Sequence, residues 1–203
     1  MFGTTIEAQY DVIAPIYAQI EPFRDRRAGA LSGGMKQKLA LSCALVHRPE
    51  ILFLDEPTTG VDAVSRREFW DLLDRLRAHG ITIVVSTPYM DEAARCDRVA
   101  LIQRGQLLTV ERPDAITAAY PLPLFAVRAA QRLRLMEALR TFPSVHAVYP
   151  FGRELHYTDA RAGAPADSIA RELAGHLESL DLRDASIRPI TAGIEDSFIH
   201  LMS

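Results

Sequence analysis

The sequence contains two short apolar runs that each predict a buried strand, separated by a segment with helical periodicity. The first run, Ile51 to Asp55, is unbroken and ends in acidic residues, which predicts a central parallel strand covered on both faces. A helix is expected over 62–78, with Gly80 as its stop, and a second buried strand over 81–86. Because parallel strands need a crossover connection, this order predicts an α/β domain with a mainly parallel sheet.

Further elements are expected on both sides of this unit. They are a helix over 4–20, capped by Thr4 or Thr5 and kinked or shortened by Pro15, a largely buried helix from Ser32 to about His47, a short acidic helix opened by Pro88, and a hairpin of strands 98–103 and 106–112.

The pattern changes near Ala119, where the linker-like Tyr-Pro-Leu-Pro segment (120–123) begins. The elements expected after it are strands at 124–128, 145–149, 153–158 and 185–190, helices at 130–141 and 166–179, and a last helix from 194. Apart from that last helix, the order is β-α-β-β-α-β, which is the ferredoxin-like arrangement. The sequence therefore predicts two domains, an α/β domain over 1–119 and a small α+β domain over 120–203.

Composition excludes several classes of protein. The 203 residues carry a net charge of −3, so no global positive field is present to hold nucleic acid. Cys43 and Cys96 belong to no Cys-x-x-Cys or Cys/His cluster, which excludes a disulfide framework and a zinc site and fits a reducing compartment. The apolar runs are far shorter than the roughly 20 residues that span a bilayer, and no secretion signal opens the chain. Any membrane role is therefore expected to act through a partner.

Three segments carry candidate chemistry. In Leu-Ser-Gly-Gly-Met-Lys-Gln (31–37), a serine cap and two glycines leave backbone N–H groups bare at the positive end of a helix, where an anion can approach; an ordinary helix cap is the alternative. In Ile-Leu-Phe-Leu-Asp-Glu-Pro (51–57), Asp55 would hold Mg²⁺ through a water and Glu56 would orient or deprotonate an attacking water, unless the pair is simply a solvated strand end. Thr-Thr-Gly-Val-Asp (58–62) is a tight turn with Asp62 as a helix cap.

In this order and spacing, residues 31–103 resemble the C-terminal half of an ABC-transporter ATPase domain, which has a P-loop NTPase-like fold. Residues 31–37 resemble the signature, 51–57 the Walker B strand, 58–62 the D-loop and 86–105 the switch segment with the closing strands. The tail is similar to the C-terminal extension of drug-export-type members, although its last helix also fits a plain amphipathic cap using Ile194, Phe198 and Leu201.

The resemblance implies ATP and Mg²⁺ as cofactors, with Asp55 and Glu56 serving this chain's own site. Two ATPase domains of this family close head to tail, so Ser32, Gly33, Gly34 and Met35 would contact ATP on a second subunit, and the D-loop residues Gly60 and Asp62 would couple the two sites. A membrane permease is the further implied partner, with no nucleic acid. The implied location is cytoplasmic, at the inner face of the membrane.

The sequence departs from the family pattern at three places. A Walker A motif, G-x-x-x-x-G-K-[ST], is missing, because Lys36 and Lys38 are the only lysines and neither fits the pattern. Pro88 stands where the family usually has a histidine that senses the γ-phosphate, and Met35 stands where glutamine is common. The chain is thus expected to be an ABC ATPase without its N-terminal half and to have little or no ATPase activity alone.

Three functional hypotheses follow. In the first, the chain is an N-terminally truncated ATP-binding and ATP-hydrolysing subunit of an export-type ABC transporter. In the second, it is a non-catalytic partner that lends its signature in trans to a complete ABC ATPase. In the third, only the C-terminal domain is functional, as a regulatory or dimerisation module.

Overall fold

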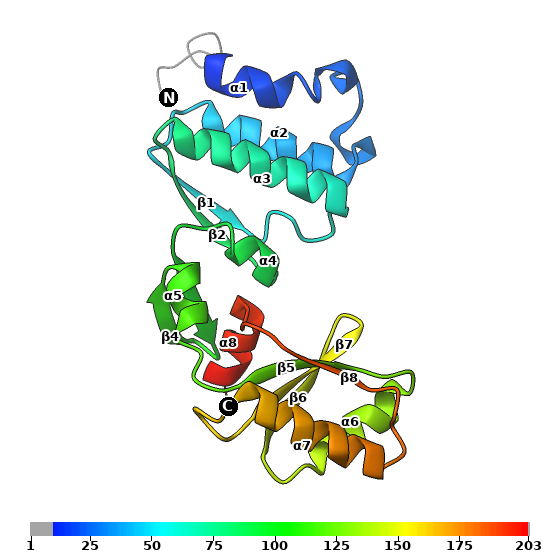
Figure 1. Ribbon diagram of the computed structural model, residues 1–203. Coiled ribbons are helices and arrows are strands. Elements are labelled where there is room, and N and C mark those ends of the chain that lie inside the picture. Colours follow the sequence, from blue (N-terminus) through cyan, green and yellow to red (C-terminus); the bar gives the residue numbers. More distant parts are fainter. Residues whose placement is uncertain (1–9, 203) are drawn as a thin grey trace. The chain divides into compact units, whose positions relative to one another are not determined.

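The computed structural model describes residues 10–202 and divides the chain into two compact units, Met1–Tyr89 and Met90–Ser203 (Figure 1). The cap predicted at Thr4 or Thr5 lies outside the described residues. The domain boundary predicted near residue 120 falls inside the second unit and stays a prediction.

The first unit begins with helices and ends with a strand, helix, strand unit. Its elements are α1 (Tyr10–Tyr17), the 3-10 turns η2 (Glu21–Phe23) and η3 (Ala28–Ala30), α2 (Gly33–Leu45), β1 (Ile51–Asp55), α3 (Ala63–Ala78) and β2 (Thr82–Ser86). Pro15 lies inside α1, which ends two residues later at Tyr17, three residues before the predicted end at residue 20. Asp62 and Gly80 flank α3 as predicted, and Gly80 has a left-handed backbone with φ +86°.

The two predicted parallel strands are confirmed, but their predicted burial is wrong. β1 pairs with β2 in parallel, with Leu52 opposite Ile83 and Asp55 opposite Ser86. Leu52 is buried, whereas Ile51 and Phe53 expose 52% and 73% of their surface. Alternating burial means that one face of this strand pair is covered and the other is open. The difference arises because nothing among the described residues covers the face that carries Ile51 and Phe53.

The helix α2 was predicted to be largely buried and is buried along one face only. That face carries Leu41, Ser42 and Leu45, while Cys43 on the opposite side is exposed. Lys38 lies on the same buried face, and its Nζ forms an ion pair with Glu68 Oε2 of α3 at 2.7 Å. A buried ammonium needs such a partner, so the polar residue is compatible with the packing of α2 on α3.

The second unit contains a hairpin, a four-stranded sheet and five helices. Its elements are α4 (Met90–Ala93), β3 (Val99–Gln103), β4 (Gln106–Glu111), α5 (Pro113–Ala118), β5 (Leu124–Arg128), α6 (Arg132–Arg140), β6 (Val145–Phe151), β7 (Glu154–Asp159), α7 (Ala166–Ser179), β8 (Ser186–Pro189) and α8 (Ile194–Leu201). The hairpin of β3 and β4 is confirmed. The helix α5 was not predicted, although Pro113 at its first position is a typical helix start.

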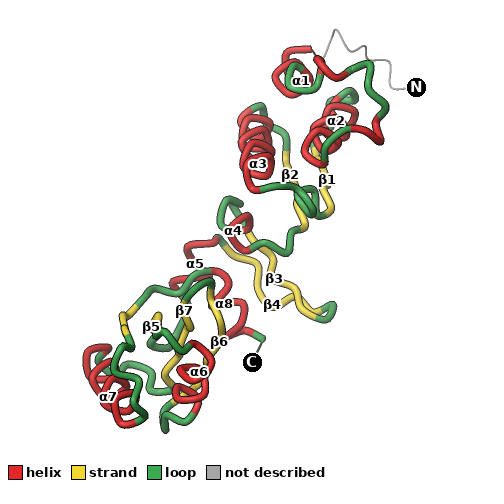
Figure 2. The backbone as a smooth tube through the Cα atoms, turned by 90° about the vertical axis from the view of Figure 1, so that its right-hand side faces the viewer, coloured by secondary structure: helices red, strands yellow, loops and turns green. Residues whose placement is uncertain are grey.

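The ferredoxin-like arrangement is confirmed. The sheet order is β6-β7-β5-β8 with every pairing antiparallel. Figure 2 shows α6 and α7 on one side of this sheet and α8 on the other. The core beneath α6 and α7 is made of residues that are essentially inaccessible to solvent, among them Phe125, Val127, Leu139, Tyr157, Ile169, Leu173 and Leu177. This continuous core joins α6 and α7 to the sheet.

Candidate ATPase site at the carboxyl end of the parallel strands

The predicted acidic pair lies where β1 and β2 end together. Asp55 is the last residue of β1 and is in register with Ser86, the last residue of β2. Asp55 Oδ1 accepts a hydrogen bond from Ser86 Oγ at 2.5 Å. The backbone N–H of Glu56 donates to Ser86 Oγ at 3.0 Å and to Ser86 O at 3.1 Å. One serine therefore holds both acidic residues at the open edge where α/β sheets bind ligands.

Glu56 has an unusual backbone conformation. Its φ of +44° lies in the left-handed region, which costs a residue with a side chain about 1–3 kcal/mol. The turn after it holds that conformation: Thr59 N donates to Glu56 O at 3.1 Å, and Thr59 Oγ1 donates to Glu56 Oε2 at 3.1 Å. The carboxylate is exposed and oriented by a neighbouring hydroxyl, so it is positioned rather than buried.

The predicted anion-binding segment forms the N-terminus of α2, where Ser32 and Gly33 are exposed and Gly34 is buried. Ser32 is the helix cap, and its Oγ accepts a hydrogen bond from Met35 N at 3.3 Å. The first intrahelical bond runs from Lys36 N to Ser32 O, so the amides of Gly33 and Gly34 precede the hydrogen-bonded turns. The helix cap and the anion site are thus compatible, because capping uses one oxygen and leaves these amides at the positive end of the helix.

Packing explains the second glycine of this segment. A Cβ atom built on Gly34 would lie 2.8 Å from Ser65 Cβ of α3, and one built on Gly33 would lie 3.5 Å from Gly60 O. The N-terminus of α2 therefore approaches both α3 and the turn at 58–62 within the first unit. Gly34 is required for this close approach whether or not a ligand binds.

We expect Gly34→Ala to lower the free energy of unfolding by about 1–3 kcal/mol, because the added methyl group overlaps Ser65. Urea denaturation followed by the fluorescence of Trp70, the only tryptophan, reports on α3 directly. Gly29→Ala, in the same unit as Trp70, is the matched control, since nothing lies within 4 Å of its Cβ position. It should change the free energy of unfolding by less than about 0.5 kcal/mol. A Gly34→Ala protein as stable as the original would contradict the packing argument.

The segment predicted as a D-loop is a tight turn that starts α3. Gly60 has φ +75°, and Val61 N donates to Thr58 O at 3.1 Å. Asp62 caps α3: its Oδ1 accepts from Val64 N at 3.1 Å and Ser65 N at 3.0 Å. Hydrogen bonds from the Ser65 backbone and side chain hold the pKa of Asp62 below its usual value, so the carboxylate stays ionised. The helix cap predicted for Asp62 is confirmed.

Pro88 lies two residues beyond Ser86 in the turn after β2. It is exposed, and the next residue donates from Tyr89 N to Thr87 Oγ1 at 3.1 Å. The side chain of Arg66 from α3 lies over the Tyr89 ring, 4.7 Å from its centroid. Proline offers no N–H and no imidazole at this position, so the turn is shaped by Thr87 and Tyr89 rather than by a phosphate-sensing side chain.

The carboxylate oxygens of Asp55 and Glu56 are the candidate ligands for the Mg²⁺ that the resemblance implies. Mg²⁺ takes oxygen ligands and commonly uses one or two carboxylates, with phosphates and water completing its shell. Asp55 and Glu56 fit that requirement, and Oδ2 of Asp55 accepts no hydrogen bond from a described residue. Among residues 10–202, no group of three or more His, Cys, Asp or Glu could hold a metal ion without other ligands. The carboxylates therefore suit a nucleotide-bound Mg²⁺ rather than a closed metal site.

The structure brings the predicted residues together in two groups. Asp55 and Glu56 lie with Ser86 and Thr59 at the end of the strand pair, and Ser32 to Met35 lie beside Gly60 to Asp62. Sequence reasoning missed Ser86 and Thr59 as members of the first group. The register of two parallel strands of five residues, both ending at the same edge, is the signal that could have identified Ser86.

Comparison with known proteins identifies relatives of this chain. The profile of the family described as "ABC transporter" matches residues 8–59. The probable multidrug ABC transporter ATP-binding protein YbhF of Escherichia coli K12 is 36% identical over 98% of this chain and 34% of its own length. The Nod factor export ATP-binding protein I of Burkholderia orbicola is 42% identical over 57% of this chain and 39% of its own length. The chain thus spans about a third of the length of these relatives.

Among solved structures, the protein cbiO1 of Clostridium perfringens, described as part of the ABC transporter complex cbiONQ, is 30% identical. The match covers 54% of this chain and 45% of that one, with a TM-score of 0.48. None of the helices within residues 10–202 is both long and apolar enough to cross a lipid bilayer. The sequence matches lead to one conclusion: residues 8–59 of this chain belong to the ABC transporter family, and 98% of the chain is similar to about a third of an ABC transporter ATP-binding protein.

Proposed function

We propose that the chain is part of the ATP-binding and ATP-hydrolysing subunit of an export-type ABC transporter. The observation that carries this proposal is the pair Asp55 and Glu56, held by Ser86 at the carboxyl end of two parallel strands. The names of the relatives, a multidrug transporter protein and a Nod factor export protein, support the export class.

The residues of the pair have different tasks in this proposal. Asp55, fixed through Oδ1 by Ser86, directs its other oxygen toward the water shell of a nucleotide-bound Mg²⁺. Glu56, held by Thr59, orients and deprotonates the water that attacks the γ-phosphate. When bound, Mg²⁺ neutralises charge on the phosphates. Pro88 has no side-chain donor or acceptor for the γ-phosphate, so Glu56 is the proposed base without a neighbouring histidine.

The signature segment acts on a second subunit in this proposal. Ser32 and Gly33 are exposed at the N-terminus of α2, and there they would contact the γ-phosphate of ATP bound to a partner. Gly34 is buried against α3 and would contribute through its backbone amide alone. Met35 contributes its backbone to the capped first turn. Gly60 lies beside this segment and Asp62 caps the helix that follows it. In the proposal these two D-loop residues couple the two ATP sites.

The 203 residues contain no Walker A motif, so they do not form the cradle for the β- and γ-phosphates of their own nucleotide. A phosphate-binding loop must come from elsewhere, on the same polypeptide or on a partner. We therefore expect the purified chain to release phosphate from MgATP at the background rate. Robust turnover that Glu56→Gln abolishes would contradict this expectation.

Association with a complete ABC ATP-binding subunit tests the proposal. We expect the chain to be retained by such a subunit in the presence of MgATP and not in its absence. Ser32→Arg places a bulky side chain at the N-terminus of α2 and should abolish retention, whereas Ser179→Arg, exposed at the end of α7, should not. Retention that is independent of both ATP and Ser32 would refute the proposed role of the signature.

A second candidate function is a non-catalytic partner that lends its signature in trans. The missing Walker A motif favours it, because the chain then never holds its own ATP. In an assembly with a complete ATPase, activity would be lost with Ser32→Arg but not with Glu56→Gln. An in-frame G-x-x-x-x-G-K-[ST] upstream of the Met1 codon would support the first function, and its absence would support the second.

A further inference from the structure

The C-terminal helix α8 contacts two parts of the second unit at once. It lies on the face of the four-stranded sheet opposite α6 and α7, and it also packs against α4 and α5 (Figure 1). In an α-helix, residues four apart share a face and residues two apart point to nearly opposite sides. Ile194 and Phe198 therefore form one stripe of α8, and Asp196 and His200 form another.

The apolar stripe joins α8 to the hairpin and its short helices. Ile194 is 5% exposed and belongs to a buried cluster that also contains Ala93 of α4, Val99 and Leu101 of β3, and Ile116 of α5. Phe198 packs against the same cluster. Ser197 adds polar contacts, since its Oγ donates to Gly193 O at 3.0 Å and to Ile116 O at 3.4 Å. Leu201, predicted to share this face, is largely exposed, so that part of the amphipathic prediction is wrong.

The polar stripe anchors α8 to the sheet. Asp196 is 1% exposed, and its Oδ1 accepts from Tyr149 OH of β6 at 2.8 Å and from His156 Nδ1 of β7 at 2.6 Å. Its Oδ2 accepts from Gly193 N at 2.7 Å, which caps the helix. Burial raises the pKa of Asp196, but these hydrogen bonds outweigh it and the pKa lies below its usual value. The buried carboxylate is therefore ionised, and His156 is the donor.

The second residue of the polar stripe extends this contact along the sheet. The His200 ring meets Tyr120 edge-on at 5.3 Å between centroids and lies 5.7 Å from the His146 ring. Tyr120 OH in turn shares a hydrogen bond of 2.9 Å with Thr158 of β7. An isolated helix of eight residues is not stable in water, so α8 exists because both stripes are occupied.

We propose that α8 is a coupling strap that links the α4–α5 segment to the C-terminal sheet, with Asp196 as its positioning residue on the sheet side. A movement of α4 or α5 would displace Ile194 and Phe198, which pack against them. Because all four residues belong to one short helix, Asp196 and His200 would move with Ile194 and Phe198. The α4 helix follows the switch position Pro88 directly in the sequence, so the strap connects the segment after the switch to the sheet. This inference concerns coupling within the chain and holds whether or not the chain hydrolyses ATP.

Amide hydrogen exchange on the full chain tests the strap. In Asp196→Asn we expect exchange about tenfold faster or more in β6 and β7, and also in α4 and α5, which Asp196 does not touch. Glu172→Gln is the matched control, since it removes one carboxylate on the other side of the same sheet, from α7. It should leave exchange in α4 and α5 unchanged. Acceleration confined to β6 and β7 in Asp196→Asn would overturn the proposal.

A variant on the apolar stripe of α8 tests the same coupling in the opposite direction, and it serves if Asp196→Asn fails to fold. Ile194→Val removes one methylene from the apolar stripe without adding a polar group, and it should accelerate exchange in the segments around Tyr149 and His156. Unchanged exchange in those segments would likewise overturn the proposal, because coupling between two sites acts in both directions.

Discussion

Glu56→Gln is expected to slow ATP hydrolysis by about 10²–10⁴-fold in an assembly that contains this chain and a Walker A loop. The amide keeps the size of the side chain and can still contact Thr59, but it cannot accept a proton from the attacking water. Because Glu56 acts on the water and not on the nucleotide, the loss should appear in kcat, with KM for ATP little changed. Steady-state phosphate release at varied MgATP measures both constants.

Glu50→Gln is the matched control for this prediction. Glu50 precedes β1 at the other end of the same strand and is exposed, so the same change of charge is made far from the candidate site. Its activity should stay within about twofold of the original, as is usual for surface substitutions without a specific partner. A small effect of Glu56→Gln, or an equal loss in both variants, would exclude Glu56 as the base.

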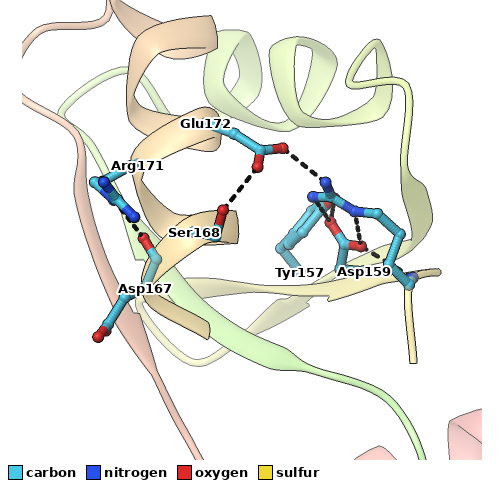
Figure 3. Close-up of polar contacts among 7 residues, drawn as sticks. Tyr157, Asp159, Asp167, Ser168, Arg171 and Glu172 are labelled. Atoms are coloured by element: carbon cyan, nitrogen blue, oxygen red, sulfur yellow. Dashed lines mark hydrogen bonds and ion pairs between the residues drawn. The ribbon is translucent and has the colours of Figure 1, made fainter. Parts of the chain in front are cut away.

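Asp159→Ala is expected to lower the free energy of unfolding of the second unit by about 1–3 kcal/mol. Asp159 is inaccessible to solvent and accepts from Arg161 Nε at 2.8 Å, Arg161 NH2 at 3.0 Å and Tyr157 OH at 2.8 Å (Figure 3). The Arg161 guanidinium also forms an ion pair with Glu172 of α7 at 2.7 Å. The Asp159 carboxylate therefore holds an arginine that links the end of β7 to α7. Its removal leaves the Tyr157 hydroxyl and part of the guanidinium without an acceptor.

The measurement must report on the second unit alone. Amide exchange in β7 does so, whereas the fluorescence of Trp70 reports on the first unit. Asp167→Asn is the control, because Asp167 is an exposed carboxylate in the first turn of α7 and should cost less than about 1 kcal/mol. An equal loss of stability in the two variants would show that the hydrogen bonds of Asp159 to Arg161 and Tyr157 do not stabilise the second unit.

The same network predicts sensitivity to acid. Burial raises the pKa of Asp159, but hydrogen bonds from Arg161 and Tyr157 outweigh it and hold the pKa below its usual value. A carboxylate with a depressed pKa stabilises the fold above the pKa of the unfolded chain, about 3.9, and this contribution is lost as the pH falls through the folded value. The urea concentration at the unfolding midpoint should therefore decrease as the pH is lowered from 5 to below about 3.9. This decrease should be steeper in the original protein than in Asp159→Asn.

Local patterns were sufficient to predict most elements of the fold and the chemical types of the site residues. Helical spacing, the caps Ser32 and Asp62, and the stop at Gly80 depend on residues within about four positions, so they can be recognised directly in the sequence. The order of the C-terminal strands likewise predicted the ferredoxin-like sheet. Resemblance to a known family then added the expected contact of Ser32, Gly33 and Gly34 with ATP on a second subunit, which spacing could not supply.

Contacts between residues far apart in the chain could not be predicted in this way. The bond from Ser86 to Asp55 depends on the register of two strands, and the need for glycine at position 34 depends on how closely α2 approaches Ser65. Burial of β1 was overestimated because an apolar run shows that a strand can be covered, not whether anything covers it. The anchoring of Asp196 by His156, 40 residues away, arises only when α8 folds back on the sheet. Such long-range contacts follow from the path of the whole chain, which no local pattern of residues encodes.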